Sequence, residues 1–195
     1  MIQIQTLVLG DYETNCYLVW AENAQEGVVI DPGYEPARIL EEAKALGKTI
    51  TAILLTHGHF DHVGGVRQLF AETDCDIYLC PEDCALPERF TAGSLCYTNS
   101  VAEGDTLQLA GLTFSVLHTP GHTPGCVCYA CEDCLFSGDT LFAGSCGRTD
   151  FPLGDWTALK KSLERLKNLP VNYKVYPGHG SATTLEAEKK YNPYL

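Results

Sequence analysis

Alternation of apolar and polar residues predicts β-strands through much of the first half of the chain. The N-terminal stretch IQIQTLVLGDYETNCYLVW predicts two strands around a turn at GDYET. Short apolar runs in EGVVIDPG, TAILL and DIYLC predict three more strands, each followed by polar or turn-forming residues.

The second half repeats this pattern. DTLQLAG and LTFSVLHTPG predict two strands around a glycine turn, and GCVCYACEDCLFSGD predicts a hairpin that turns near CEDC. YKVYPGHG predicts a last strand that leads into a loop. Between the two halves, Pro81 to Ser100 is irregular, and we expect a loop or lid beside a site there.

Four segments carry apolar residues at helical spacing. EPARILEEAKALG ends at Gly47, and DHVGGVRQLFAE predicts one helix that begins inside a histidine-rich motif. DWTALKKSLERLKNL predicts a helix capped by Asp155, and SATTLEAEKKYNPYL predicts a closing helix with a short tail. Helices follow strands in both halves, so we expect an α/β fold of two sheets packed face to face with helices outside, in one domain over residues 1–195.

Composition narrows the classes of partner. The net charge of -12 opposes binding to a nucleic-acid backbone, and the basic residues of LKKSLERLK fit the exposed face of a helix. The N-terminus lacks a basic start and a continuous apolar core, and no apolar run is long enough to span a membrane. We therefore expect a cytoplasmic protein with a small-molecule substrate and ten reduced cysteines. The oligomeric state stays open.

The segment THGHFDHVGG concentrates metal-binding side chains directly after a predicted buried strand. It contains His57, His59, Asp61 and His62, and the ends of strands are where α/β sheets place their chemistry. His57 and His59 are two residues apart and point the same way in an extended segment, whereas Asp61 and His62 lie past the bend and can face a second metal ion.

Three further candidate ligands also follow predicted strands, in loops that contain glycine or proline. They are His122 in TPGHTPG, Asp139 in SGDTLF and His179 in PGHG. One lone histidine would more often be a hydrogen-bonded turn or core residue. Five histidines and two aspartates in this order instead predict a metal site, and imidazole with carboxylate suits zinc, iron or manganese.

The motifs THGHFDH, TPGHT, SGDTLF and PGHG resemble the metallo-β-lactamase superfamily, and within it the single-domain, glyoxalase-II-like (hydroxyacylglutathione hydrolase-like) proteins. The resemblance extends through NCYLV, VVIDPG and GRTDFPLGD. It implies a four-layered αββα sandwich with two divalent metal ions at one edge, zinc first and iron or manganese as alternatives. The first ion takes His57, His59 and His122.

The second ion takes Asp61, His62 and His179, and Asp139 bridges both ions beside a bridging hydroxide. The implied reaction is hydrolysis of small thioesters such as S-lactoylglutathione, in which the hydroxide attacks the carbonyl and Asp61 steers its proton. A thiolate leaves without a dedicated general acid. Asp61 and Asp139 are thus the candidate catalytic residues. Full-length glyoxalase II has a C-terminal helical region that helps to bind glutathione, and this sequence stops at NPYL, so we expect weaker glutathione recognition.

Three other residues have open roles. Arg148 in GSCGRTDFP is a candidate ligand for a substrate carboxylate, with an ion pair to Asp150 or Asp155 as the equal alternative. His118 matches no ligand position, so a supporting or surface role is preferred. Asp31 in IDPG either supports the metal site or caps a turn.

Two rival functions remain. A persulfide dioxygenase resembles the chain at TPGHTPGCV and SCGRTDF and would hold one iron ion with His57, His122 and Asp139, although PGHG favours the hydrolase. A non-enzymatic metal or redox sensor is suggested by a cluster of four cysteines in CVCYACEDC. These are Cys126, Cys128, Cys131 and Cys134. Buried cysteine is a common small apolar residue, which makes the sensor the weaker alternative.

Overall fold

Two six-stranded sheets form the centre of the protein in the computed structural model, which describes residues 1–195. The first sheet has the order β1-β2-β3-β4-β5-β6, with β1 to β3 antiparallel and β3 to β6 parallel. Its strands are β1 (Ile2–Leu9), β2 (Thr14–Ala21), β3 (Glu26–Ile30), β4 (Thr49–Leu54), β5 (Asp76–Leu79) and β6 (Asn99–Ser100).

The second sheet is built from the second half of the chain and has the order β14-β13-β10-β9-β8-β7. Its strands are β7 (Thr106–Leu109), β8 (Leu112–His118), β9 (Val127–Cys131), β10 (Cys134–Gly138), β13 (Lys174–Pro177) and β14 (Thr183–Thr184). A separate two-stranded ribbon joins β11 (Leu141–Phe142) to β12 (Ser145–Cys146).

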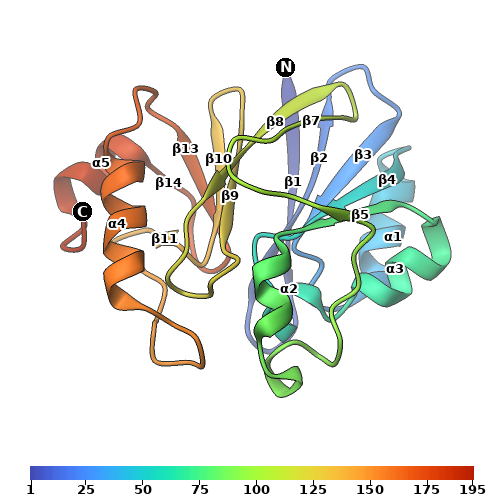
Figure 1. Ribbon diagram of the computed structural model, residues 1–195. Helices are drawn as coiled ribbons and strands as arrows, with labels where there is room; N and C mark the ends of the chain where they lie inside the picture. The colour runs from blue at the N-terminus through green and yellow to red at the C-terminus, as the bar shows by residue number, and fades with distance from the viewer.

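Helices cover the outer face of each sheet, as Figure 1 shows. Helices α1 (Pro36–Ala45) and α3 (Val66–Thr73) pack on the first sheet, where Ile39 and Leu69 join the apolar cluster of its outer face. Helices α4 (Trp156–Lys167) and α5 (Leu185–Tyr191) pack on the second sheet through Leu163 and Leu185. None of these helices has the length and apolarity that a membrane crossing requires.

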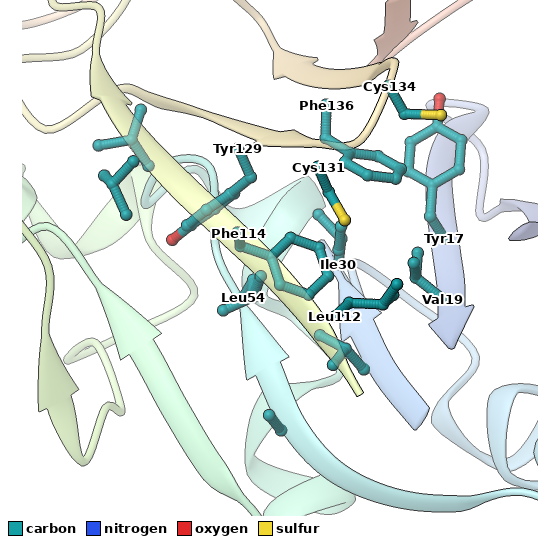
Figure 2. Packing of buried hydrophobic residues seen from close by; sticks show 14 of the residues in the cluster. Tyr17, Val19, Ile30, Leu54, Leu112, Phe114, Tyr129, Cys131, Cys134 and Phe136 are labelled. Atoms are coloured by element: carbon teal, nitrogen blue, oxygen red, sulfur yellow. The ribbon is translucent and has the colours of Figure 1, made fainter. Parts of the chain in front are cut away.

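The core between the sheets is an apolar cluster of 17 buried residues that come from both sheets. In Figure 2, Tyr17, Ile30 and Leu54 of the first sheet face Phe114, Tyr129 and Phe136 of the second. Together with the two outer clusters, this core gives four layers in the order helix, sheet, sheet, helix. The predicted αββα sandwich is confirmed.

The structure corrects two predicted helices. The segment DHVGGVRQLFAE forms two helices, α2 (Phe60–Val63) and α3, because Gly64 and Gly65 lie directly against the backbone of Pro32 and Gly33. A side chain at either glycine would collide with that backbone. The closing segment first adds β14 to the second sheet, and α5 begins only after Thr184, whose hydroxyl caps it.

The predicted irregular segment from Pro81 to Ser100 contains two short 3-10 helices, η1 (Pro81–Ala85) and η2 (Glu88–Phe90), before β6. The predicted cap of α4 is present, since Asp155 accepts hydrogen bonds from the backbone N–H groups of Thr157 and Ala158. Phe90 of this segment contacts Phe151, which lies in the loop before α4. Both rings lie at the edge of the sandwich that carries the candidate metal ligands.

Candidate metal centre

The ends of four strands bring the seven predicted ligands together. The loop after β4 carries His57, His59, Asp61 and His62, and the loops after β8, β10 and β13 carry His122, Asp139 and His179 respectively. All seven are buried except His179, which is partly exposed. The first sheet thus supplies four ligands, and the second sheet supplies three.

His57, His59 and His122 form the first group. One ligand atom of each lies within 4.8 Å of the others, and Nδ1 of His59 is 2.9 Å from Nε2 of His122. Burial lowers the pKa of His59 to about 3, and the neighbouring His122 adds to this effect. Burial also lowers the pKa of His57 well below its ordinary value. These two imidazoles are therefore neutral at physiological pH, which is the form that binds metal ions.

Asp61, His62 and His179 form the second group. Oδ2 of Asp61 is 3.3 Å from Nε2 of His179 and 3.7 Å from Nε2 of His62. Burial alone would raise the pKa of Asp61, but His179 and His62 hold it well below its usual range. Burial alone would lower the pKa of His62, but the carboxylates of Asp139, Asp31 and Asp61 raise it to about 10.

Asp139 lies between the two groups. Its Oδ1 is 3.4 Å from Nε2 of His62, and its Oδ2 is 3.5 Å from Nε2 of His122 and 3.6 Å from Nε2 of His179. Gly178 makes this geometry possible, because a side chain there would collide with Asp139 and the ring of His62. One carboxylate therefore faces both groups.

Asp31 positions the second group through a buried hydrogen-bond network. Its Oδ2 is 2.9 Å from Nδ1 of His62 and accepts the hydroxyl of Thr56 at 2.6 Å, while its Oδ1 accepts the backbone N–H of Thr56 at 2.8 Å. The contact to Nδ1 directs Nε2 of His62 toward Asp61, Asp139 and His179. Asp31 therefore supports the site and also fixes the turn after β3, where its φ is 52°.

Asp83 is a buried support of the first group that the sequence pattern did not reveal. Its carboxylate accepts the backbone N–H groups of Gly58 and Gly125 at 2.6 Å each and the hydroxyl of Thr123 at 2.9 Å. Gly58 lies between His57 and His59, and Thr123 follows His122. Burial raises the pKa of Asp83, and these donors partly offset that effect. One carboxylate thus joins both ligand-bearing loops of the first group.

A cavity of about 560 Å³ opens over the ligands. Its lining includes an aromatic collar, formed by Tyr12, Phe60, Phe90, Phe142 and Phe151. The predicted lid segment contributes Arg89 and Phe90 to this wall. The cavity therefore combines an apolar rim with a polar floor, which is typical of a small-molecule site.

Arg148 also lines the cavity, and the ion pair proposed as its alternative role is present. Its guanidinium makes two hydrogen bonds to Asp150, at 2.6 and 2.7 Å, and stacks 4.0 Å over the ring of Phe151. Asp155 is not its partner, because Asp155 caps α4. Arg89 is the second cationic residue of the wall. Binding of a substrate carboxylate by Arg148 stays a prediction.

The remaining candidates lie away from the ligands. His118 contacts the carbonyl oxygen of Pro124 with Nε2 at 2.8 Å and is not part of either group. The four cysteines of the proposed sensor cluster do not converge on one point. Cys128 packs in the outer cluster with α4, whereas Cys131 and Cys134 face the core between the sheets. None of them belongs to a group of three metal-competent side chains.

The residues present fit two metal ions. Nε2 of His57 and Oδ1 of Asp139 are buried without a hydrogen-bond partner, and the rings of His59 and His122 face one another at hydrogen-bond distance. A bound cation satisfies such lone pairs, and the donor set of imidazole and carboxylate suits divalent transition metals. Which metal the protein holds is not determined by these donors, since zinc, iron and manganese all accept them.

Comparison with known proteins supplies the family. Residues 9–179 match the family model described as the metallo-beta-lactamase superfamily. The chain belongs to the metallo-β-lactamase superfamily. All seven ligands lie inside the match, and the resemblance inferred from the motifs is confirmed. Proteins of this fold bind two divalent metal ions, which the histidine cluster described above fits.

Similar proteins that cover nearly the whole chain include a curated relative and solved structures. Hydroxyacylglutathione hydrolase GloC of Haemophilus influenzae is 36% identical and covers 100% of this chain and 98% of its own. The BLEG-1 B3 metallo-beta-lactamase is 36% identical with a TM-score of 0.89, covering 98% of this chain and 99% of its own. These matches support a metal-dependent hydrolase of the superfamily.

The other two structures bear on the metal and the chemistry. TTHA1623, solved in a di-iron-bound form, is 41% identical with a TM-score of 0.87 and covers 98% of this chain and 100% of its own. ETHE1 from Myxococcus xanthus is 33% identical with a TM-score of 0.86 and covers 98% of this chain and 83% of its own. The superfamily members similar to this chain therefore include a protein that holds two iron ions.

Proposed function

We propose that the protein is a thioester hydrolase that uses two metal ions to cleave small acyl-thiols such as S-lactoylglutathione. The observation that carries this proposal is Asp139, which faces two complete groups of ligands. Two ions would give both groups of ligands a role in the reaction. The relative named hydroxyacylglutathione hydrolase supports the same reaction.

In this proposal His57, His59 and His122 hold the first ion, and Asp61, His62 and His179 hold the second. Asp139 bridges them. Zinc is the proposed metal, with iron or manganese as alternatives. When bound, the two ions supply a hydroxide nucleophile near neutral pH and polarise the substrate carbonyl. We place the protein in the cytoplasm, where thiols stay reduced.

The side chains of the site divide the remaining work. Asp61 is ionised, because neighbouring histidines lower its pKa, so its carboxylate accepts a hydrogen bond from the nucleophile and steers its proton. Asp31 keeps Nε2 of His62 directed at the site. A thiol has a pKa near 8.5, so the thiolate leaves with little help from an acid. No dedicated acid is therefore required beside the leaving group.

The cavity sets the class of substrate. Its aromatic collar would pack against an apolar or thiol-bearing arm, and Arg89 gives its rim positive charge, while Arg148 is paired with Asp150 until a substrate carboxylate takes that place. This suits a small anionic acyl-thiol. We assign substrate-carboxylate binding to Arg148, whose bidentate contact with Asp150 shows that its guanidinium can present two parallel N–H groups to a carboxylate.

The proposal is tested with one metal-loaded sample assayed with and without oxygen. Thioester cleavage should persist without oxygen, because hydrolysis consumes only water. Asp61→Asn should lower turnover by about 100-fold or more, through loss of the carboxylate and of the second ion. Asp74→Asn is the matched control, because Asp74 is exposed and belongs neither to the cavity lining nor to the ligand groups. If Asp61→Asn hydrolyses thioesters as fast as the unaltered protein, the proposal is wrong.

The alternative is a persulfide dioxygenase with one iron ion on His57, His122 and Asp139. The similarity to ETHE1 and the motifs TPGHTPGCV and SCGRTDF favour it. It predicts that thioesters stay intact while glutathione persulfide drives oxygen consumption. It also predicts one bound metal ion per chain, which Asp61→Asn leaves in place.

A further inference from the structure

A second group of metal-competent side chains lies outside the proposed active site. Cys80 follows β5 of the first sheet, Glu82 lies in η1, and His118 ends β8 of the second sheet. One ligand atom of each residue lies within 4.8 Å of the other two. We propose that these three residues form a third metal site, for zinc or another divalent ion that favours sulfur.

The donor set suits such an ion. Thiolate, imidazole and carboxylate are the three kinds of side chain that bind zinc in proteins, and three protein ligands leave the fourth position of a tetrahedral site for water. Sulfur selects against magnesium and calcium, which prefer oxygen. Binding displaces the proton of the Cys80 thiol, which passes to the buffer as the sulfur becomes a ligand.

The surroundings favour a cation. Cys80 is only 3% exposed, yet with Glu82 and His118 it lines a cavity of about 380 Å³. Asp105 lines the same cavity and adds negative charge, and Glu103 also lines it, with its charge paired to Arg165. The buried sulfur is therefore reachable by an ion through an opening that carries carboxylates.

His118 is already oriented within this group. Its Nε2 lies 2.8 Å from the carbonyl oxygen of Pro124, and its backbone N–H donates to Glu103 at 2.7 Å. Glu103 is itself fixed by an ion pair with Arg165. The same Nε2 lies 3.5 Å from Oε2 of Glu82, so an ion bound at Nε2 would displace the contact with Pro124, whereas an ion bound at Nδ1 would leave Nε2–H donating to that carbonyl, as metal-binding histidines commonly do.

A bound ion would link the two sheets at one edge of the sandwich, because Cys80 and His118 come from different sheets. It would also fix η1, which contains Asp83, the residue that joins the two loops of the first ligand group. The role of this third site is thus structural support next to the active centre.

Cobalt(II) provides a selective probe. The seven ligands of the proposed active site are nitrogen and oxygen donors, so a sulfur-to-cobalt charge-transfer band in the near ultraviolet can arise only from a cysteine. Full-length protein titrated with cobalt should show this band and bind one more ion per chain than Cys80→Ser. The band should be absent in Cys80→Ser. It should be unchanged in Cys84→Ser, the control at a neighbouring exposed thiol.

Two milder variants cover the case in which Cys80→Ser does not fold. His118→Gln and Glu82→Gln alter a partly exposed and an exposed side chain, and each should weaken the cobalt affinity measured by the band by roughly tenfold or more. No band in the unaltered protein at saturating cobalt overturns the proposal. So does a band that persists in Cys80→Ser, or an affinity that both glutamine variants leave unchanged.

Discussion

Replacing Asp83 by alanine should destabilise the protein and weaken its hold on the first metal ion. The substitution removes the acceptor of three buried hydrogen bonds. The hydroxyl of Thr123 can turn to the sulfur of Cys126, which lies 3.1 Å away. The backbone N–H groups of Gly58 and Gly125 cannot turn, so two buried donors lose their partner.

The cost follows from these two donors. A hydrogen bond to a charged group contributes about 1.5–3 kcal/mol, so Asp83→Ala should lower the free energy of unfolding by about 3–6 kcal/mol. Domains of this kind have roughly 5–15 kcal/mol in total. Asp83→Asn keeps one acceptor oxygen and should lose about half as much. Comparing the two variants separates the effect of lost hydrogen bonds from that of lost side-chain volume, because asparagine keeps the size of aspartate and alanine does not.

Urea denaturation of the metal-free protein measures the free energies, and circular dichroism at zero urea checks that each variant folds. Competition with a chelator measures affinity, and loss of a group that supports the ligands costs about 10–100-fold in metal binding. The reasoning is refuted if Asp83→Ala unfolds within about 1 kcal/mol of the unaltered protein. It is also refuted if the asparagine variant is the less stable of the two.

Three other predictions follow from the site. In the metal-free protein the pKa of His62 is raised to about 10 from an ordinary 6.5, so His62 is protonated at pH 8. Loading the second group with metal at pH 8 should therefore release about one proton, measured as acidification of a weakly buffered solution. Uptake of protons would contradict this. Arg148→Ala should raise KM for anionic thioesters more than it lowers kcat, whereas Arg38→Ala on the exposed side of α1 should change neither; equal loss in kcat would show that Arg148 acts in the chemical step. Cys146 lines the cavity, but burial raises the pKa of its thiol, so Cys146→Ser should keep most turnover per metal-loaded molecule; loss of activity with metals retained would make Cys146 a nucleophile.

The sequence predicts the longer strands well because each alternates or runs apolar and is followed by polar or turn-forming residues. The candidate ligands His57, His122 and His179 follow such strand ends, which is why the sequence pattern predicts that they lie together. Strands of two residues, such as β6 and β11, are too short to show an alternation of apolar and polar residues, so the sequence does not predict them. The break between α2 and α3 depends on the backbone of Pro32 and Gly33, which is distant in sequence.

Supporting residues were harder to predict than ligands. Asp83 bonds to groups 25 and 42 residues away, and nothing in PEDCALP identifies those partners. Its position after a buried strand, at the edge that carries the ligands, is the only local sign. Asp31 and Arg148 each had two compatible roles in the sequence. The structure shows both roles for Asp31, and for Arg148 it shows the ion pair to Asp150.

Each ligand group takes residues from both halves of the chain. His57 and His59 meet His122 in one, and Asp61 and His62 meet His179 in the other. A polypeptide cut in the exposed turn at Gly104 would therefore yield two fragments, neither of which has a complete set of donors for either ion. Metal binding would therefore require the two fragments to assemble. A bound ion would show that the N-terminal and C-terminal parts of the chain are packed together.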